Sequence, residues 1–192
     1  MPSGSHSPKT GQQFVRIIGG TWRSRRLKFP VAVGLRPTGD RIRETLFNWL
    51  GQRLYEQRCL DCFAGSGALG FEALSRGAAH VVMCENNRAV FAALQANARE
   101  LAPEPSRLDL RFGDALQCAH LLTPPFDIIF LDPPFGLPLL APMLDICQHL
   151  LAPQGKVYVE HHQPLVISSP WHVWREGHAG NVFFALLSRA DS

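Results

Sequence analysis

Apolar and polar residues follow two rhythms along the chain from about residue 58 onward. Short apolar runs such as residues 126–131 are typical of strands buried on both faces, whereas apolar positions three and four residues apart indicate amphipathic helices. The runs predict strands at 59–62, 81–84, 108–112, 128–131 and 157–159, and the helical spacing predicts helices near 67–76, 87–101, 115–122 and 139–150. This alternation predicts an α/β fold with a mostly parallel sheet, in which ligands bind at the carboxyl ends of the strands.

The pattern differs at the two ends of the chain. Residues 171–174 and 182–187 predict an antiparallel hairpin added to the edge of the sheet. Near the start, residues 15–27 predict a β-hairpin around a Gly19-Gly20 turn, and a helix capped by Thr38 or Asp40 follows and ends at Leu50. The predicted domains are a disordered Ser/Gly/Pro-rich tail (1–13), an N-terminal hairpin and helix (14–50) and the α/β domain (51–192).

Charge separates the N-terminal segment from the rest of the chain. Residues 1–43 hold nine basic residues and one acidic residue, a net charge of +8, whereas residues 44–192 hold ten basic and fifteen acidic residues, a net charge of −5. A basic arm on a mildly acidic body indicates a polyanionic partner for the arm, although a merely solvated basic face is the plainer alternative. Seven of the nine basic residues are arginines, whose planar fork suits phosphates and bases.

Composition excludes some classes of protein. No apolar stretch approaches the length of a membrane span, so a membrane location is not expected. The five cysteines are an odd number scattered among apolar residues, which is typical of a reducing cytoplasm. Cys59 and Cys62 form a lone C-x-x-C without a second pair, so we expect two buried strand cysteines and no metal site.

The tetrapeptide Asp132-Pro133-Pro134-Phe135 follows the apolar run at 126–131 and carries the most specific chemistry. Each proline fixes its own φ and restricts the preceding residue, so the loop is stiff. The carboxylate and the carbonyl before the first proline are hydrogen-bond acceptors, and an aromatic ring stands beside them. Acceptors next to a stacking face suit a planar group with an exocyclic amine, such as a nucleobase. The plainer alternative is a proline-stiffened turn with a solvated Asp and a core Phe.

A glycine-rich loop between the first predicted parallel strand and its helix indicates a cofactor site. Gly65, Gly67 and Gly70 form a G-x-G-x-x-G pattern, which also occurs in sites for NAD-type dinucleotides. Asp61 places a negative charge beside this loop, and that charge would repel a pyrophosphate. It favours a cofactor with a positive centre and an amino group, and S-adenosylmethionine has both and no phosphate. Glu85, at the end of the next strand, suits ribose hydroxyls with either cofactor.

These motifs resemble, in order and spacing over about residues 58–160, those of Rossmann-like S-adenosylmethionine-dependent methyltransferases. The resemblance implies that the loop lines the methionine and adenosine, that Glu85 takes the ribose hydroxyls and that Asp114 contacts the adenine amino group. It implies a catalytic loop formed by Asp132, Pro133, Pro134 and Phe135. The implied cofactor-binding residues are Asp61, Phe63, Ala64, Gly65, Ser66, Gly67, Glu85, Asn86, Asp114 and Ala115.

A narrower resemblance covers the chain from about Arg16 to its end and weakens after Glu160. The segments 16–20, 34–38, 41–50 and 59–69 are similar to the bacterial 16S ribosomal RNA guanine-N2 methyltransferase family, whereas 101–108 and 118–126 show no matching motif. This resemblance implies a cytoplasmic, monomeric enzyme that methylates a guanine in 16S rRNA, within the small subunit or an assembly intermediate. The residues expected to grip the RNA are Arg16, Arg23, Arg25, Arg26, Lys28, Arg36, Arg41 and Arg43.

Two alternatives remain open at this point. A DNA adenine-N6 or cytosine-N4 methyltransferase also acts on an exocyclic amine, but such enzymes usually carry a sizeable target-recognition domain, and only about 55 residues precede the first parallel strand here. A non-enzymatic RNA-binding assembly factor would keep the basic arm, but it would not be expected to keep Asp61, Glu85 and Asp132 together. The Asp at position 132 disfavours a protein-glutamine methyltransferase, since those resemble Asn-Pro-Pro-aromatic.

Overall fold

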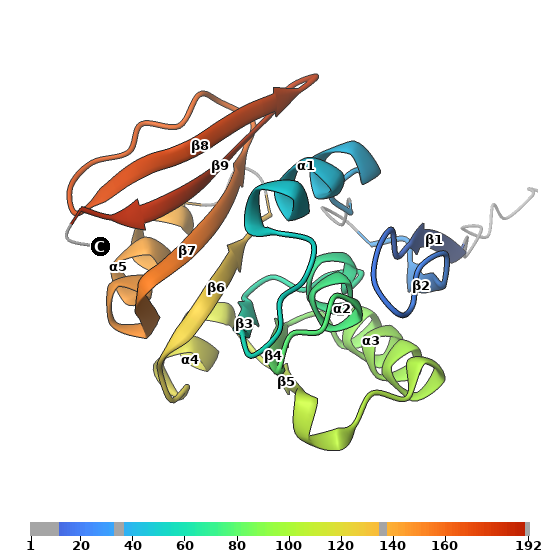
Figure 1. The fold of residues 1–192 in the computed structure, drawn as a ribbon. Coiled ribbons are helices and arrows are strands. Elements are labelled where there is room, and N and C mark those ends of the chain that lie inside the picture. Colours follow the sequence, from blue (N-terminus) through green and yellow to red (C-terminus); the bar gives the residue numbers. More distant parts are fainter. Residues whose placement is uncertain (1–11, 33–36, 135–137, 191–192) are drawn as a thin grey trace, which may run out of the picture.

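The computed structural model describes residues 12–32, 37–134 and 138–190, and its described strands form a seven-stranded sheet and a separate hairpin (Figure 1). The order across the large sheet is β5-β4-β3-β6-β7-β9-β8. β3 to β7 pair in parallel, whereas β9 pairs antiparallel with both β7 and β8. The predicted parallel sheet and C-terminal hairpin are therefore confirmed. The strands are β3 (Arg58–Asp61), β4 (His80–Glu85), β5 (Leu108–Phe112), β6 (Phe126–Leu131), β7 (Leu151–His161), β8 (Trp171–Ala179) and β9 (Val182–Arg189).

Helices cover both faces of the sheet. α1, α2 and α3 contribute to one hydrophobic core, and α4 and α5 contribute to a second core on the opposite face. In β6, Ile128 and Phe130 belong to the first core, whereas Ile129 and Leu131 belong to the second. Burial on both faces explains the continuous apolar run in the sequence. The helices are α1 (Asp40–Leu50), α2 (Ala68–Ser75), α3 (Arg88–Leu101), α4 (Ala115–His120) and α5 (Leu140–Leu150), with a 3-10 turn η1 (Pro105–Arg107).

The strand order places a switch point at the centre of the sheet. From β3 the chain moves outward to β4 and β5, and it then returns to the other side of β3 to form β6 and β7. In an open parallel sheet, ligands bind in the crevice outside the carboxyl ends of the strands at such a switch point. Asp61 ends β3, and Asp132 follows directly after β6. The topology thus brings these two carboxylates to the same crevice.

The N-terminal hairpin differs from its prediction. β1 (Gln12–Arg16) and β2 (Arg26–Pro30) pair in register from Gln12↔Pro30 to Arg16↔Arg26, so residues 17–25 form a long connection. Of the predicted strand over 21–27, only residues 26 and 27 belong to β2, and the prediction for 21–25 was wrong. This connection lies on the end of α2, where Thr21 N donates to Ser75 O (2.8 Å) and Trp22 N donates to Ser75 Oγ (2.9 Å). Gly20 has φ 74°, and a Cβ there would lie 1.8 Å from Ser75 O. Close packing on α2 therefore replaces the tight turn.

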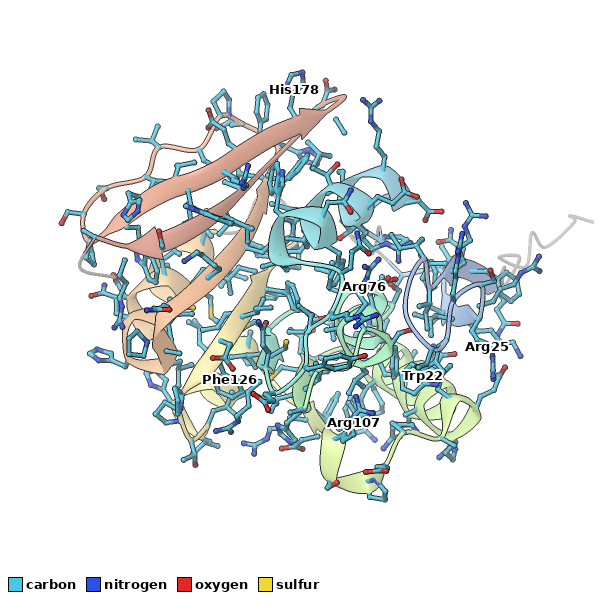
Figure 2. The ribbon with its side chains drawn as sticks, in the orientation of Figure 1. Trp22, Arg25, Arg76, Arg107, Phe126 and His178 are labelled. Atoms are coloured by element: carbon cyan, nitrogen blue, oxygen red, sulfur yellow. The ribbon has the colours of Figure 1, made fainter. Side chains whose placement is uncertain are left out.

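The hairpin and α1 pack into the same core as the α/β domain. Val15 and Leu27 from the hairpin belong to one cluster of buried side chains with Phe71 of α2. Figure 1 shows the hairpin beside α2 and α3, at the end of the molecule away from β8 and β9, and Figure 2 labels Arg25 there. The predicted domain boundary at residue 50 stays a prediction. Residues on both sides of it pack into the same hydrophobic core. Of the predicted tail, only residues 12 and 13 are described, and they belong to β1.

A buried ion-pair cluster ties the hairpin, α1 and α2 together. Glu72 Oε2 accepts hydrogen bonds from Ile18 N (2.8 Å) and Arg43 Nη1 (3.3 Å), and its Oε1 accepts from Arg76 Nε (2.8 Å). Figure 2 shows Arg76 where α1, α2 and the hairpin meet, and its guanidinium lies 4.7 Å over the ring of Phe47. Both arginines are buried, because Glu72 compensates their charge in the interior. The predicted role of Arg43 as an RNA contact requires an exposed side chain, which this cluster does not allow.

All five cysteines are free and buried, as expected for Cys59 and Cys62. The described residues contain no helix that is long and apolar enough to cross a membrane. Within the same residues, no group of three or more His, Cys, Asp and Glu side chains is arranged to hold a metal ion.

Candidate active site

A cavity of about 300 Å³ opens at the carboxyl ends of β3, β4, β5 and β6, which is a size typical of small-molecule sites. The predicted residues that line it are Asp61, Phe63, Ala64, Gly65, Ser66, Glu85, Asn86, Asp114, Ala115, Asp132, Pro133 and Pro134. Gly67 is not part of the described wall, and Phe135 lies outside the described residues. The sequence did not lead us to Ala32, Pro37, Thr38, Cys62, Ala68, Leu69, Cys84, Asn87, Val90, Gly113 or Leu139.

The wall of this cavity is strongly acidic. Four carboxylates line it (Asp61, Glu85, Asp114 and Asp132), and the described lining residues include no Lys, Arg or His. Carboxylates brought together out of water repel one another, and burial beside acidic neighbours raises the pKa of Asp61 and Asp132. A ligand with a positive charge relieves this repulsion, whereas a phosphate adds to it. The cavity is therefore suited to a cationic ligand.

Asp61 supports the glycine-rich loop from beneath. Its Oδ2 accepts a hydrogen bond from Gly70 N (3.1 Å), in the first turn of α2. Burial raises the pKa of Asp61 to about 7, repulsion from Glu85 adds to the rise, and bonds from the backbone of Gly70 and Phe63 oppose it. In a dinucleotide site, the helix N-terminus following this loop binds the pyrophosphate. Here a carboxylate already accepts from that turn, which argues against an NAD-type site.

The loop itself depends on glycine at position 67. Gly67 is the N-cap of α2 with φ 78°, and a Cβ at this position would lie 2.5 Å from the ring of Phe71. Its N–H donates to Ala64 O (2.7 Å), and Ala64 N donates to Cys84 O (2.9 Å). Gly67 thus shapes the loop from behind the cavity wall, which explains why it is not one of the lining residues.

Glu85 joins the ends of β3 and β4. Its Oε2 accepts from Gly65 N (3.0 Å) in the loop, and its Oε1 accepts from Asn87 N (2.7 Å). Asn87 in turn caps α3 by accepting from Ala89 N (3.0 Å) and Val90 N (3.2 Å). Each oxygen of the Glu85 carboxylate therefore has a fixed donor, and its second lone pair is available to a hydroxyl in the cavity.

Asp114 is the N-cap of α4. Its Oδ1 accepts hydrogen bonds from Leu116 N (3.0 Å) and Gln117 N (3.3 Å). No donor within the described part of the chain bonds Oδ2. Because Asp114 lines the cavity, this second oxygen can accept from an amino group of a ligand.

Asp132 lies at the switch point, next to two other carboxylates. Burial raises its pKa well above the usual range, repulsion from Glu160 and then Asp61 adds to the rise, and a hydrogen bond from Thr38 opposes it. Glu160 is buried on β7, and its Oε1 accepts from Tyr158 Oη (2.6 Å). Perturbed carboxylates that share a cleft are a mark of functional sites. Glu160 and Tyr158 were not predicted, although an acid at the end of a buried strand is a signal that could have found Glu160.

Thr38 reaches the site from a distant part of the chain. Its hydroxyl donates to Asp132 Oδ2 (3.3 Å), and its carbonyl accepts from Arg43 Nε (3.1 Å). It was predicted as one of two possible caps of α1. The N-cap is Gly39, whose position carries no side-chain capping bond, so that prediction was wrong. Thr38 instead fixes the orientation of the Asp132 carboxylate.

The predicted RNA-binding residues fall into three groups. Arg43 is fully buried in the Glu72 cluster, so its assignment as an RNA contact is corrected. Arg36 lies outside the described residues. The others are exposed and belong to the hairpin, its connection or the first turn of α1: Arg16, Arg23, Arg25, Arg26, Lys28 and Arg41.

Comparison with known proteins gives consistent matches over most of the chain. Ribosomal RNA small subunit methyltransferase D of Escherichia coli K12 is 41% identical over 185 residues, covering 94% of this chain and 92% of the relative. The protein of the same name from Haemophilus influenzae is 40% identical over 178 residues, covering 90% of this chain and 92% of the relative. The solved structure of the putative methyltransferase yhhF from Escherichia coli matches with a TM-score of 0.81 and 42% identity, covering 92% of this chain and 98% of that one.

The fold and the acidic cavity at its switch point together define a Rossmann-like methyltransferase. The match to the relatives extends through the N-terminal hairpin as well as the α/β domain. The chain belongs to the family described as conserved hypothetical protein 95, whose model matches residues 15–188.

Proposed function

We propose that this protein transfers the methyl group of S-adenosylmethionine to the N2 of a guanine in 16S rRNA, within the small subunit or an assembly intermediate. The observation that carries the proposal is a cavity lined by four carboxylates and no described cation, with the Asp132-Pro133-Pro134 loop in its wall. The names of the relatives support rRNA as the substrate. The choice of guanine N2 rests on the family resemblance of the sequence. A cytoplasmic monomer is part of the same proposal.

The acidic wall fits S-adenosylmethionine, which supplies an activated methyl group on a sulfonium centre and carries no phosphate. Asp61 and the loop at residues 63–66 provide negative charge and backbone groups for the methionine end. Glu85 has one lone pair on each oxygen for the ribose hydroxyls, and Asp114 Oδ2 is available for the adenine amino group. Asn86 and Ala115 complete the set of lining residues assigned to this cofactor.

Asp132 holds the target amine in this account. The lone pair of guanine N2 is delocalised into the ring, so the nitrogen is a poor nucleophile. The Asp132 carboxylate and the Asp132 carbonyl, which precedes Pro133, accept its two N–H bonds and favour a pyramidal nitrogen with its lone pair directed at the methyl group. Transfer would form the N–C bond as the methyl–sulfur bond breaks and the sulfonium becomes a neutral thioether. The nitrogen must then lose a proton, and the raised pKa of Asp132 suits a group that would take it up. We also assign Phe135 to stacking on the target base.

The hairpin supplies the polyanion-binding surface. Arg23 and Arg25 lie on the connection that hydrogen bonds to Ser75 fix to α2, and Arg16, Arg26 and Lys28 lie on the paired strands, so these residues form a rigid platform rather than a loose arm. Binding to phosphates by such residues releases counterions and weakens as salt rises. The target base must leave its stack to reach the cavity. Contacts to the RNA on either side of that base help to hold it in the extruded position.

Asp61 is expected to reduce stability as it ionises. Its pKa is about 7 in the folded protein, whereas an Asp in an unfolded chain has a pKa of about 4. At a pH between these two pKa values, Asp61 is more fully protonated in the folded state than in the unfolded state. This group therefore makes the free energy of unfolding fall as the pH rises. Asp61→Asn should remove that contribution, and the variant should gain stability relative to the parent protein from pH 5 to pH 8. Urea unfolding across this range measures the difference.

Asp145→Asn is the matched control for this prediction, because it makes the same substitution at an acid that is exposed on α5 and does not line the cavity. The same Asp61→Asn variant should bind S-adenosylmethionine at least about tenfold more weakly, since it loses a charge-assisted contact. An identical pH dependence in the parent protein and Asp61→Asn would contradict the assigned ionisation.

Neutralising Arg23, Arg25 and Arg26 together with Gln should weaken RNA binding and flatten its salt dependence. Each lost phosphate contact on a single strand reduces the slope of log K against log salt by about 0.7. A filter-binding titration at several salt concentrations, with S-adenosylhomocysteine present, measures this slope. Arg53→Gln with Arg175→Gln is the control, because both arginines are exposed outside the hairpin. An unchanged slope in the hairpin variant would make these arginines a solvated face only.

The proposal as a whole is tested by offering labelled S-adenosylmethionine with three polymers in parallel: protein-free 16S rRNA, small ribosomal subunits and duplex DNA. We expect transfer to RNA or to subunits and none to DNA. Transfer to DNA would favour the alternative of an adenine-N6 or cytosine-N4 DNA enzyme. Cofactor-independent RNA binding without any transfer would favour the non-enzymatic assembly factor.

A further inference from the structure

The outward face of the hairpin presents an aromatic ring among basic residues. Side chains alternate along β1, so Val15 is buried while Phe14 and Arg16 lie on the opposite face, and Phe14 is 51% exposed. The register places Lys28 across from Phe14 and Arg26 across from Arg16. An exposed aromatic ring with cations beside it is the combination with which proteins bind single-stranded nucleic acid.

The pairing of Arg16 with Arg26 is unfavourable for the hairpin alone. Like charges directly opposite each other on two strands destabilise the pair. Asp40 relieves only one of them, because its Oδ2 accepts from Arg16 Nε (2.9 Å). Arg26 has no ion pair or hydrogen bond from its side chain to any described residue. An anion held between the two guanidinium groups would remove the repulsion.

A groove of about 360 Å³ lies on this face and reaches the active site. Its described lining combines the hairpin residues with the segment before α1: Phe14, Val15, Arg16, Arg26, Pro37, Thr38, Gly39 and Asp40. Pro37 and Thr38 also line the catalytic cavity. Since Thr38 bonds Asp132, the groove ends one residue away from the catalytic carboxylate. An RNA strand whose target base entered the cavity would have the neighbouring nucleotide at this groove.

We propose that the groove is a subsite for the RNA nucleotide adjacent to the methylated guanine, a proposal that rests on the function proposed above. Its base stacks on Phe14, and its phosphate is bound by Arg26 together with the guanidinium nitrogens of Arg16 that do not bond Asp40. The Asp40 carboxylate does not repel this phosphate strongly, because Arg16 and Arg43 Nη2 (2.6 Å) both neutralise it. The oxygens of the Asp40 carboxylate can accept hydrogen bonds from the N–H groups of a base edge.

The chemistry of base extrusion explains why an aromatic ring belongs here. When the target base leaves the stack, its neighbour loses a stacking partner and exposes one face. Phe14 replaces that partner without selecting a sequence, because every base has such a face. The subsite thereby offsets part of the cost of extrusion, and it assigns to Phe14 a role distinct from the general phosphate contacts of the other basic residues.

Phe14→Ala tests the subsite with little risk to the fold, because the side chain is half exposed and lies outside the buried core. We expect the dissociation constant for the RNA substrate to rise at least about fivefold, with cofactor affinity and thermal midpoint unchanged, and we expect Phe14→Trp to restore binding. Tyr55→Ala is the matched control, since Tyr55 is exposed and precedes β3, at the opposite end of the parallel strands. Equal loss in both alanine variants, or none in Phe14→Ala, would overturn the proposal.

An abasic scan separates stacking at this site from a diffuse effect. The substrate is prepared with the base removed at each position flanking the methylated nucleotide. One abasic position should weaken binding to the parent protein as much as Phe14→Ala does, and it should add little further loss in Phe14→Ala itself. Additive losses would contradict the subsite. If the parent protein transferred no methyl group to the intact RNA, the proposed function would fail, whereas transfer that is indifferent to Phe14 would reject the subsite alone.

Discussion

Asp132→Ala is expected to lower methyl transfer by about 10²- to 10⁴-fold, the range associated with a positioned acceptor or base. The carboxylate is fixed by Thr38, lies in the cavity wall and is held at a raised pKa by burial and by its acidic neighbours. Removing it leaves the target amine without its principal acceptor. Single-turnover transfer under saturating cofactor measures the chemical step directly.

The loss should be confined to chemistry. S-adenosylmethionine affinity should stay within a few-fold of the parent value, because Asp61, Glu85 and Asp114 remain in place. Asp132→Asn keeps the shape and one acceptor oxygen, and it should retain more activity than Asp132→Ala while remaining well below the parent. Asp145→Ala serves as a control for loss of an acidic residue outside the cavity. Undiminished turnover in Asp132→Ala would remove this residue from the catalytic assignment.

Glu72→Ala should destabilise the protein by about 3–5 kcal/mol, the cost associated with breaking a buried ion pair. Glu72 bonds Arg43 and Arg76, and the substitution leaves these two guanidinium groups buried without their shared counter-charge. The Ile18 N–H loses its acceptor as well, so the hairpin should loosen from α2. Urea unfolding at neutral pH measures the loss, and hydrogen exchange locates it.

The comparison variant is Glu100→Ala, which removes an acid with the same side-chain chemistry from the surface. Glu100 lies 3.8 Å from Arg25 and 3.6 Å from Lys28, and all three side chains are about half exposed. Exposed pairs contribute about 1 kcal/mol or less. A similar cost for both substitutions would mean that the Glu72 cluster does not hold the hairpin to the domain.

The parts of the fold that the sequence predicts well are those where a local pattern has a single physical cause. β6 is buried on both faces, so its run of apolar residues could only be a central strand or a buried helix segment, and its length favours the strand. The acidic residues at the ends of β3, β4 and β6 are predicted to lie near one another, because parallel strands end at one edge of the sheet. The sequence therefore predicts that Asp61, Glu85 and Asp132 lie at one edge of the sheet, and all three line the same cavity.

What the sequence did not predict depends on contacts between distant residues. The Gly19-Gly20 pair favours a tight turn locally. Hydrogen bonds to Ser75 instead hold the connection on the end of α2, and the connection is longer than a tight turn. Arg43 is polar enough to suggest a surface position, and its burial depends on Glu72 in another helix together with Asp40. Thr38 bonds Asp132 across 94 positions of sequence, so no local pattern assigns it to the active site.

The central claim is that the Asp132 loop presents the exocyclic amine of a guanine to a methyl donor. Its most direct test is to digest RNA methylated by the parent protein and to identify the modified nucleoside by mass spectrometry against authentic standards. The account predicts N2-methylguanosine as the product, and it predicts that Asp132→Ala yields at least about 10²-fold less of it under the same conditions. A methyl group on adenine N6, cytosine N4 or a ring nitrogen would contradict it.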